Sequence, residues 1–444
     1  LAAAGDIDPA VHGAAAAQPR WAATPAAEGA AVLRRAAQLL EQHRSEAEQW
    51  LIREGGSVRA KADFEIGSAL DELWVAASLP TQPHGVLQPA APGATSVARR
   101  VPLGVVGVIA PWNVPMVLSL RAVAPALALG NTVVLKPDPR TAVSGGVFLA
   151  RLFEQAGLPD GVLHVLPGDA GCGAALAAHP GVAAIAFTGS TAVGRQIGET
   201  AGRALKRALL ELGGNNALIV LDDADLDAAA SAGAWGSFLH QGQICMAAGR
   251  HLVHEAVVDD YLERLTARAA KLTVGDPWTG PADLGPLIDS TQLRRVAGIV
   301  DASVAAGARI RTGGTYDGLF YQPTVLGGVT PRMPAFTEEI FGPVAPVIAV
   351  RDDEHALELA NSTDHGLVAA VQTGSVARGE ALADRLRAGM VHINDQTVND
   401  DAFVSFGGWG ASGNGARFGA QHSWDDFTQW QWVSAKREAP VFPF

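Results

Sequence analysis

Short β-rich runs and helical runs alternate along most of this chain, and this alternation constrains the fold more than any other feature. From residue 104 onward the β-rich runs are GVVGVIA, TVVLKP, VLHVLP, AAIAFTG and RALLELGG. Helices are expected between them, at PMVLSLRAVAPALALG, over 141–156, near 172–178 and from Thr191 to about Ala201. This order builds βαβ units, in which helices cover both faces of a parallel sheet. The sequence therefore predicts an α/β protein.

A second series of the same kind begins after Gly214 and contains the runs ALIVLDDAD, RHLVHEAV, ARIRTGG, VAPVIAV, LVAAVQTG and GMVHIND, with helices near 225–240 and 256–271. Because 444 residues exceed what one hydrophobic core usually organises, we expect two domains. We place their boundary at 213–214, where two glycines are hinge candidates.

Two segments outside these series have their own patterns. Residues 28–52 predict one surface helix whose apolar face consists of Leu33, Ala36, Leu40, Ala47 and Leu51. Residues 80–100, which contain several prolines and glycines, predict a connector or a protruding hairpin.

The run VPLGVVGVIAPWNVPMVLSL, residues 101–120, is as long as a bilayer is thick and carries no charge. Its three prolines and two glycines disfavour a membrane-spanning helix. The β-branched residues from Val105 to Ile109 instead favour a strand buried on both faces. We predict a strand, a break at Pro111, and then a helix.

Composition narrows the class of partner. A hydrophobic fraction of 48% with 18% charged residues is typical of a soluble globular protein. The formal net charge of -12 argues against a nucleic-acid or anionic-membrane surface, so we expect a small-molecule partner. Two cysteines exclude a disulfide framework and a Cys-rich metal site, and favour a reducing, cytoplasmic compartment. The N-terminal LAAAGDIDPA lacks a basic n-region and an initiator Met, so we expect no signal peptide and a few preceding residues.

Three side chains could carry chemistry. Cys245 follows a helix in the turn GQIC and is the better candidate for a reactive thiolate, whereas Cys172 is expected to be a buried structural residue. Asn113 is either an amide donor to an oxyanion or a helix N-cap. Glu211 is either a base at the end of a strand or a solvated carboxylate.

The turn TGSTAVG, from Thr188 to Gly194, lies between an expected strand and an expected helix. Its N–H groups and the helix dipole would suit a diphosphate. The alternative is a plain βα turn without a ligand. The sequence lacks G-x-G-x-x-G after a strand, a P-loop, a G-x-S-x-G elbow and H-E-x-x-H. These absences leave Cys245 as the candidate nucleophile.

Seven motifs taken together, PWN, GNTVVLKP, FTGS, ELGG, GQIC, EEIFGPV and FGGWGASGNG, resemble the aldehyde dehydrogenase superfamily in order and cover nearly the whole chain. Within it, APWNVPMVLSLRAVAPALALGN, LHQGQICM and VHINDQTVND look most like bacterial benzaldehyde and vanillin dehydrogenases. The resemblance implies the aldehyde dehydrogenase fold, with a Rossmann-like NAD(P)-binding domain over 1–83 and 104–213. It further implies an α/β catalytic domain over 214–404 and a small β oligomerisation element over 84–103 and 425–444, which would form homodimers or homotetramers.

The resemblance also assigns roles to matching positions. Cys245 would be the nucleophile, its backbone N–H and Asn113 the oxyanion hole, and Glu211 the base for the deacylating water. NAD, or alternatively NADP, would contact residues at the strand ends and turns: Ala110, Pro111, Trp112, Lys136, Pro139, Gly189, Ser190, Gly194, Leu212, Gly213, Glu339 and Phe341. The aldehyde would lie among Val117, Arg121, Trp235, Phe238, Ile244, Met246 and Phe406. No metal is expected.

The implied activity is NAD(P)-dependent oxidation of an aromatic aldehyde to the acid, through a thiohemiacetal and a thioester on Cys245. Pro139 stands where NAD-preferring relatives commonly have Glu, and Arg140 follows it, so NADP remains an alternative. Arg121 stands where semialdehyde-acid oxidisers carry a carboxylate-binding Arg, but a helix Arg paired with an acidic residue at a domain interface is the favoured interpretation. A CoA-acylating relative and a catalytically silent binding protein are further alternatives, although both fit poorly with the presence of Cys245 and Glu211.

Overall fold

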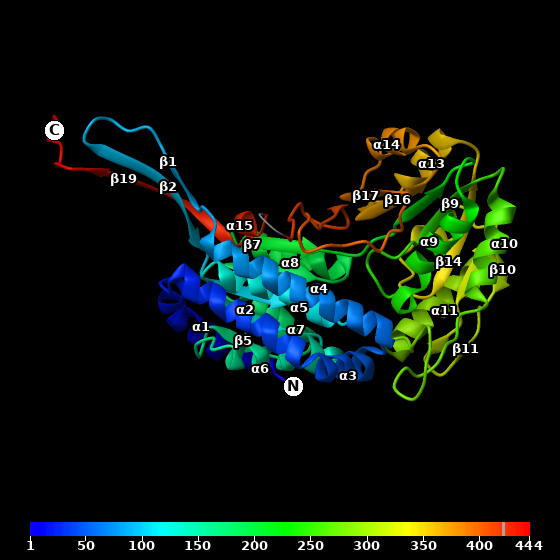
Figure 1. Cartoon of the computed structure of the whole chain (residues 1–444), viewed down its shortest axis with the longest axis horizontal. Helices are drawn as coiled ribbons and strands as arrows, with labels where there is room; N and C mark the ends of the chain where they lie inside the picture. Colours follow the sequence, from blue (N-terminus) through cyan, green and yellow to red (C-terminus); the bar gives the residue numbers. More distant parts are fainter. Residues whose placement is uncertain (420–421) are drawn as a thin grey trace.

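The computed structural model describes residues 1–419 and 422–444, which form two α/β lobes and a projecting arm (Figure 1). The first lobe contains a five-stranded sheet, the second lobe a seven-stranded sheet, and the arm a three-stranded sheet. The α/β prediction is therefore confirmed. Among the described residues, none of the helices has the length and apolarity needed to cross a membrane.

The first lobe is built on five parallel strands in the order β5-β4-β3-β6-β7. The strands are β3 Val105–Ile109, β4 Thr132–Lys136, β5 Leu163–Val165, β6 Ala184–Thr188 and β7 Arg207–Glu211. The helices are α1 Ile7–Ala22, α2 Ala26–Gln42, α3 Arg44–Gly55, α4 Arg59–Ser78, α5 Pro115–Ala128, α6 Phe148–Gln155, α7 Ala170–Ala178 and α8 Thr191–Arg203.

The uncharged run is a strand and a helix, as predicted. Val106 and Val108 of β3 pack in the core that contains α2, α4 and α5, whereas Val105 and Ile109 pack in the core that contains α1, α7 and α8. Helices therefore cover both faces of the sheet, which explains why β3 carries no polar face. Helix α5 begins at Pro115, after the break.

Two predicted helices are interrupted. The apolar face expected over 28–52 is buried, but the segment consists of α2 and α3, because His43, at φ -99° and ψ 17°, leaves the helical region. The helix expected over 141–156 is α6 preceded by one π-turn over Val143–Val147. The glycines in that turn permit close packing, since a Cβ on Gly146 would lie 2.6 Å from Pro137.

The second lobe has the strand order β10-β13-β14-β9-β8-β16-β17, in which only β10 pairs antiparallel. The strands are β8 Ala217–Val220, β9 Arg250–His254, β10 Arg309–Thr312, β13 Thr324–Gly327, β14 Val344–Val350, β16 Val368–Gln372 and β17 Met390–Ile393. The helices are α9 Leu226–Phe238, α10 Val258–Ala269, α11 Ser290–Ala305, α12 Pro334–Thr337, α13 Asp353–Ala360 and α14 Val376–Ala383. Two short pairs, β11 Tyr316–Asp317 with β12 Phe320–Tyr321 and β15 His365–Gly366 with β18 Trp409–Gly410, complete the strands outside the arm.

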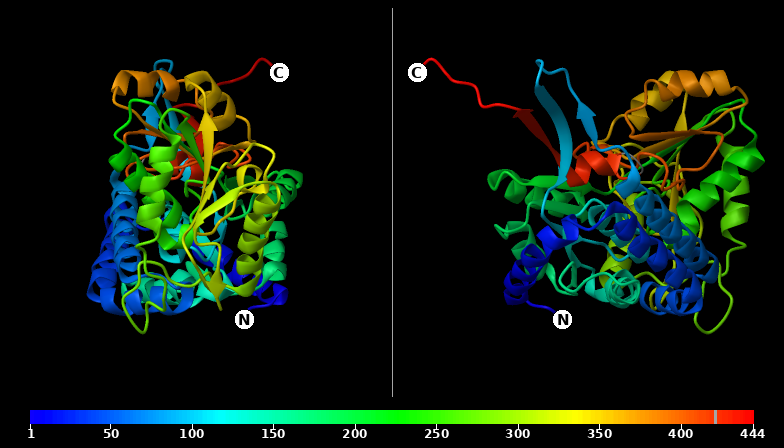
Figure 2. Two further views of the ribbon diagram at one scale, coloured as in Figure 1. Left: turned by 90° about the vertical axis from the view of Figure 1, so that its right-hand side faces the viewer. Right: turned by 60° about the vertical axis from the view of Figure 1, so that its left-hand side comes forward.

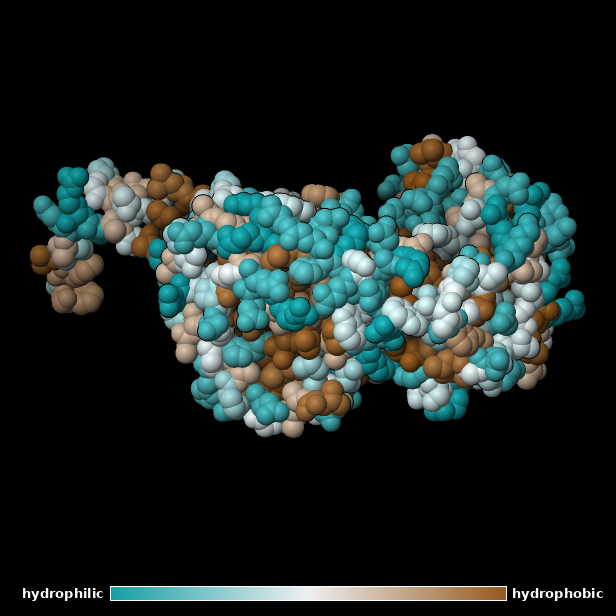
Figure 3. Space-filling view, turned by 60° about the horizontal axis from the view of Figure 1, so that its bottom comes forward, coloured by the Kyte–Doolittle hydropathy of each residue, from teal (hydrophilic) through white to brown (hydrophobic). Residues whose placement is uncertain are grey.

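The arm joins distant parts of the sequence. Strands β1 Gly85–Leu87 and β2 Ala94–Pro102 form the hairpin expected within 80–100, and β19 Thr428–Lys436 pairs with β2 along nine residues after the short helix α15 His422–Phe427. Figures 1 and 2 show this sheet extending away from the lobes. Its exposed apolar side chains include Trp430 and Trp432, and hydrophobic atoms are visible on the arm in Figure 3.

Candidate active site

The carboxyl ends of the first lobe's strands are where an open α/β sheet has its ligand-binding crevice. The chain adds β4 and β5 on one side of β3 and then returns to add β6 and β7 on the other, so the strand order reverses between β3 and β6. Ligands of open α/β sheets bind at such a reversal. The structure brings the predicted cofactor residues 110–112, 136 and 188–194 to this edge, because they end β3, β4 and β6.

Helix α8 begins at this crevice. Ser190 is its N-cap, and the Ser190 hydroxyl accepts a bond from the Val193 N–H at 3.4 Å. Gly194 in the first turn allows Leu212 to pack closely, since a Cβ on Gly194 would lie 2.3 Å from that side chain. The remaining first-turn N–H groups suit an anion, as expected from the motif.

Lys136 ends β4 and is buried, so desolvation lowers its pKa, although Asp138 opposes the shift. Arg140 is bound by two carboxylates: it donates to Asp138 at 2.8 Å and to Asp289 at 2.6 Å. Its guanidinium also lies 5.1 Å from the centre of the Trp112 ring. The positive charge next to Pro139 is thus already matched by negative charge.

Two residues of the second lobe reach the crevice. The Glu339 carboxylate accepts a bond from the Gly214 N–H at 3.0 Å, and a Cβ on Gly213 would lie only 2.2 Å from it. Phe341 packs edge-to-face on Trp112, with ring centroids 5.5 Å apart. The two glycines at the expected domain boundary therefore allow close approach of Glu339.

Cys245 lies on the loop between α9 and β9. Three consecutive residues of this loop, His240, Gln241 and Gly242, have positive φ angles of 50°, 58° and 67°. A side chain on Gly242 would meet the carbonyl oxygen of Gly342 at 2.1 Å. Burial first, and then the Glu339 and Glu211 carboxyls, raise the pKa of the Cys245 thiol to about 12.

Asn113 is buried between β3 and α5, and its side-chain amide donates to the carbonyl of Gln243 at 3.0 Å. It is not the N-cap of α5: that position is Val114, which provides no side-chain bond. Because an amide nitrogen carries two hydrogens, one N–H of Asn113 remains beyond the bond to Gln243. The structure thereby brings Asn113 to the loop that carries Cys245.

Glu211 ends β7 and is buried rather than solvated. Among the described residues neither of its carboxylate oxygens has a hydrogen-bond partner. Burial raises the pKa of Glu211 well above its usual value, and the charge of Arg417 opposes this only in part. An unpartnered buried carboxyl is expensive, and such groups in native structures are typical of functional sites.

Arg121 on α5 is paired with acidic side chains. Its guanidinium donates to Glu72 at 2.8 Å and to Asp400, and it lies 4.5 Å from the Phe406 ring centre. Two carboxylates thus match its single charge. This arrangement leaves little positive charge for a substrate carboxylate.

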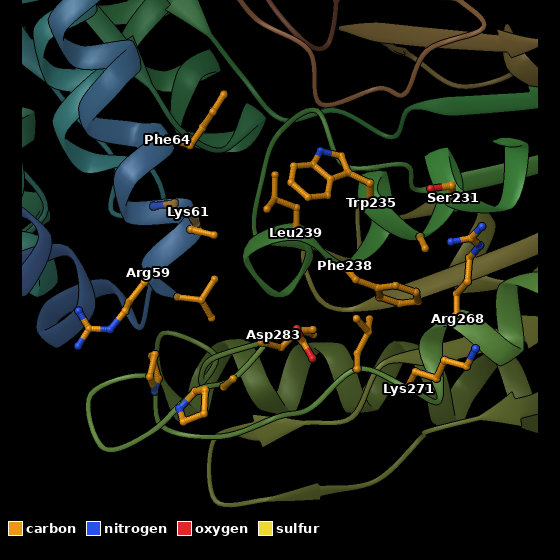
Figure 4. Close-up of a pocket in the computed structure, with 18 of the residues that line it drawn as sticks. Arg59, Lys61, Phe64, Ser231, Trp235, Phe238, Leu239, Arg268, Lys271 and Asp283 are labelled. Carbon is orange, nitrogen blue, oxygen red and sulfur yellow. The ribbon is translucent and has the colours of Figure 1, made fainter.

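The other predicted substrate residues lie in three places. Ile244, Met246 and Phe406 belong to one apolar cluster that includes Cys245 and Leu239, whereas Val117 packs in the core of the first lobe. Trp235, which is half exposed, and Phe238, which is buried in a core cluster, line a pocket of about 830 Å³ between α4, α9 and α10 (Figure 4).

Sequence reasoning missed several residues of this region. Phe64 and Leu239 line the pocket, and Leu239 also contacts the Cys245 cluster. Lys61 and Glu65, on the buried face of α4, contact Asn113 and Met116. Two opposite charges four residues apart on an otherwise apolar helix face are the signal that could have identified this pair.

Cys172 is buried in α7 and packs in a core cluster, as expected for a structural cysteine. One group of described residues has metal-ligand spacing, Asp8 with His12 and His179. It lies on α1 and at the end of α7, away from Cys245, and its members bond one another.

A Rossmann-like parallel sheet whose open edge faces a second α/β lobe is the architecture of a dinucleotide-dependent oxidoreductase. The chain belongs to the aldehyde dehydrogenase family, since the sequence profile of the Aldehyde dehydrogenase family matches residues 1–433. The chain is 56% identical over 445 residues to a vanillin dehydrogenase of Amycolatopsis sp., covering 100% of this chain and 92% of the relative. It is 52% identical to a benzaldehyde dehydrogenase [NAD(+)] of Pseudomonas putida, covering 99% and 90%.

A crystal structure of an NAD-dependent benzaldehyde dehydrogenase from Corynebacterium glutamicum superposes with a TM-score of 0.89 at 43% identity, covering 100% of this chain and 91% of the other. The predicted family and fold are therefore confirmed.

Proposed function

We propose that this protein oxidises an aromatic aldehyde to the carboxylic acid with NAD+. The observation that carries the proposal is the buried carboxyl of Glu211, whose oxygens have no hydrogen-bond partner among residues 1–419 and 422–444 and whose charge contributes to the raised pKa of the Cys245 thiol. The similarity to vanillin and benzaldehyde dehydrogenases supports the aromatic substrate. The apolar cluster of Ile244, Met246 and Phe406 suits a flat ring.

In the proposed reaction the Cys245 thiol first loses its proton to solvent water; the thiolate sulfur then attacks the aldehyde carbon, and the carbonyl oxygen becomes an alkoxide. The free amide N–H of Asn113 and the backbone N–H of Cys245 stabilise that charge. NAD+ bound at the residues proposed below would supply the acceptor for the hydride that is lost when the alkoxide collapses to a thioester on Cys245. Glu211 then takes a proton from a water molecule, whose oxygen attacks the thioester, releasing the acid and the thiol.

Cys245 and Glu211 must each be deprotonated before they can act as nucleophile and base. Burial favours the neutral forms of the Cys245 thiol and the Glu211 carboxyl, because it raises both pKa values. Glu211 can serve as a base only after it has lost its proton. We therefore expect kcat, which includes deacylation, to rise with pH through the raised pKa of Glu211.

NAD+ is proposed before NADP+ for an electrostatic reason. The guanidinium of Arg140 is held by Asp138 and Asp289, so it offers little net charge to a 2′-phosphate. Lys136 and the Asp138 carboxylate instead suit ribose hydroxyls. We propose the ribose contact for Lys136, the diphosphate contact for the turn 188–194, and the nicotinamide contacts for Glu339 and Phe341.

The domain roles and the assembly are also proposals. The first lobe would bind the cofactor, the second would carry the nucleophile, and the arm would pair with another copy to form a dimer or tetramer. Half-exposed Trp430 and largely exposed Trp432 support a role of the arm in association. The two free thiols suit a reducing cytoplasmic location.

The experiment is to measure kcat/KM for benzaldehydes, aliphatic aldehydes and succinic semialdehyde, each with NAD+ and NADP+, for the wild-type protein and Cys245→Ala. We expect benzaldehydes with NAD+ to be the best pair and Cys245→Ala to be inactive while still binding NAD+. Full oxidation by Cys245→Ala would refute the mechanism. A preference for succinic semialdehyde would indicate that Arg121 binds the carboxylate of the substrate. Turnover that requires CoA, or NAD+ binding with no oxidation across the panel, would overturn the proposed reaction.

A further inference from the structure

Helix α4 carries a buried ion pair that touches the turn containing Asn113. The Lys61 and Glu65 residues are 3% and 1% exposed. The Lys61 ammonium donates to the Ser57 hydroxyl at 3.1 Å, to Glu65 at 2.5 Å and to the backbone carbonyl of Asn113 at 3.0 Å. An ammonium has three hydrogens, so each has a partner.

Glu65 holds the other side of the same turn. Its second carboxylate oxygen accepts the backbone N–H of Met116 at 2.8 Å. That N–H belongs to the first turn of α5, where amides have no partner within the helix and where the N-cap, Val114, supplies none. The ion pair therefore binds the backbone at two points near the start of α5, the Asn113 carbonyl and the Met116 N–H.

Asn113 is held at both its backbone and its side chain. Its backbone carbonyl is held by Lys61 from α4, and its amide by the carbonyl of Gln243 from the Cys245 loop. Two anchors on opposite lobes fix the direction of the remaining amide N–H. A displacement of about 1 Å at such a donor can cost on the order of 100-fold in rate.

Stability alone gives no account of this pair. Desolvation of two buried charges offsets most of their attraction, so well-packed apolar residues usually serve a core at least as well. The neighbouring buried His240 offers no alternative cation, because desolvation and then the charge of Lys61 lower its pKa well below the usual value. Lys61 is thus the charged donor next to Asn113.

We propose that Lys61 is a positioning residue for aldehyde oxidation: its ammonium, neutralised by Glu65, fixes the Asn113 carbonyl and thereby aims the Asn113 amide at the forming oxyanion. This inference rests on the proposed function of Asn113. Lys61 is expected to act on the chemical step and not on cofactor binding, since none of its partners belongs to the proposed cofactor residues.

The first test compares Lys61→Met with the wild-type protein and with the control Lys206→Met. Lys206 also donates to backbone carbonyls, those of Ala177 and His179, but away from Cys245. For Lys61→Met we expect kcat for benzaldehyde to fall by about 10- to 100-fold, with the Kd for NAD+ and the rate of Cys245 alkylation by iodoacetamide unchanged. Lys206→Met should keep the wild-type kcat. An unchanged kcat in Lys61→Met overturns the proposal.

A double-mutant cycle with Asn113→Ala separates positioning from general damage. If Lys61 acts through Asn113, Lys61→Met in the Asn113→Ala background should lower kcat by less than about twofold, because the amide that it aims is gone. The same 10- to 100-fold loss in both backgrounds would show that Lys61 acts independently of Asn113 and would overturn the proposal.

Lys61→Met leaves Glu65 as an uncompensated buried charge, so this variant can fail to fold. The variant Lys61→Met with Glu65→Gln removes both charges, retains an acceptor for the Met116 N–H, and should show the same loss of kcat. Failure of the whole proposed function is recognised separately, because the wild-type protein would then oxidise no benzaldehyde. If the wild-type protein oxidises benzaldehyde and the double variant does so with the same kcat, only the role of Lys61 is refuted.

Discussion

Two neighbouring regions of this molecule treat their buried polar groups in opposite ways. In the contact between α4 and α5, the buried charges of Lys61, Glu65, Arg121 and Glu72 are paired. Around Cys245, the described side chains with buried atoms that lack partners include Glu211, His240, Gln241 and Gln243. The first region resembles an ordinary core network, whereas the second carries polar groups that the fold leaves unsatisfied.

The difference indicates which region is a scaffold and which is reserved for a ligand. Positive φ angles at His240 and Gln241 add backbone strain to the second region. Natural proteins break local rules chiefly where function requires it. We infer that water, aldehyde and cofactor complete the bonding around Cys245, while the α4–α5 network holds that loop's neighbours in place.

The largest expected effect comes from Glu211→Gln, which removes the proposed base from the unsatisfied region. Kcat should fall about 10³-fold, equivalent to about 4 kcal/mol, because the thioester can no longer be hydrolysed efficiently. One equivalent of NADH per Cys245 should still appear rapidly, since the first half-reaction does not use the base. Rapid-mixing absorbance at the NADH band measures both quantities. Loss of the burst as well as of turnover would place Glu211 before hydride transfer instead.

The scaffold should respond in stability. Arg121→Met removes the cation that binds Glu72 and Asp400 and leaves the buried Glu72 and the partly buried Asp400 without their counter-charge, so we expect the free energy of unfolding to fall by about 3 kcal/mol. Urea unfolding followed by circular dichroism measures this. The control Arg385→Met breaks the exposed pair with Glu354 and should leave the urea midpoint unchanged. Equal midpoints for both variants would contradict the scaffold role.

The same contrast explains what the sequence could predict. The strand, break and helix over 101–120 follow from local pattern, because β3 is buried on both faces and Pro111 and Pro115 mark the break. Cys245 and Asn113 end the motifs GQIC and PWN, and Glu211 begins ELGG, so short motifs identify all three residues. Their chemistry depends on local residue types, which a single sequence displays.

Pairings between distant segments could not be predicted. Arg121 meets Asp400 across 279 positions, and nothing near either residue marks the other as a partner. The break at His43 has no proline or glycine to announce it. Without the family resemblance Glu211 is either a base or a solvated carboxylate, because strand position alone does not show that Gly407 and Gly413 lie against it.

A smaller effect is expected at the glycine that separates the lobes. A Cβ on Gly213 would lie 2.2 Å from the Glu339 carboxylate, so Gly213→Ala must displace Glu339 from its bond to the Gly214 N–H. If Glu339 binds the nicotinamide ribose, the Kd for NAD+ should rise about tenfold, equivalent to about 1.4 kcal/mol. Fluorescence titration with NAD+ measures it. Gly202→Ala on α8, where an added Cβ has open space, is the control. Equal Kd values for the two variants would show that Glu339 does not contribute to NAD+ binding.

The smallest effect tests how the raised pKa of Glu211 changes the free energy of unfolding with pH. Its pKa is raised in the folded protein, so the folded state binds more protons than the unfolded state at pH values between the unfolded and folded pKa. Stability from this group is therefore greatest below the unfolded pKa and is lost as pH rises toward the folded pKa, by at most about 1.4 kcal/mol per pH unit. Glu211→Gln lacks this titration. Urea unfolding from pH 5 to 8 should thus show the variant gaining on the wild-type protein as pH increases, whereas parallel stability curves would mean that Glu211 finds a partner that keeps its pKa ordinary.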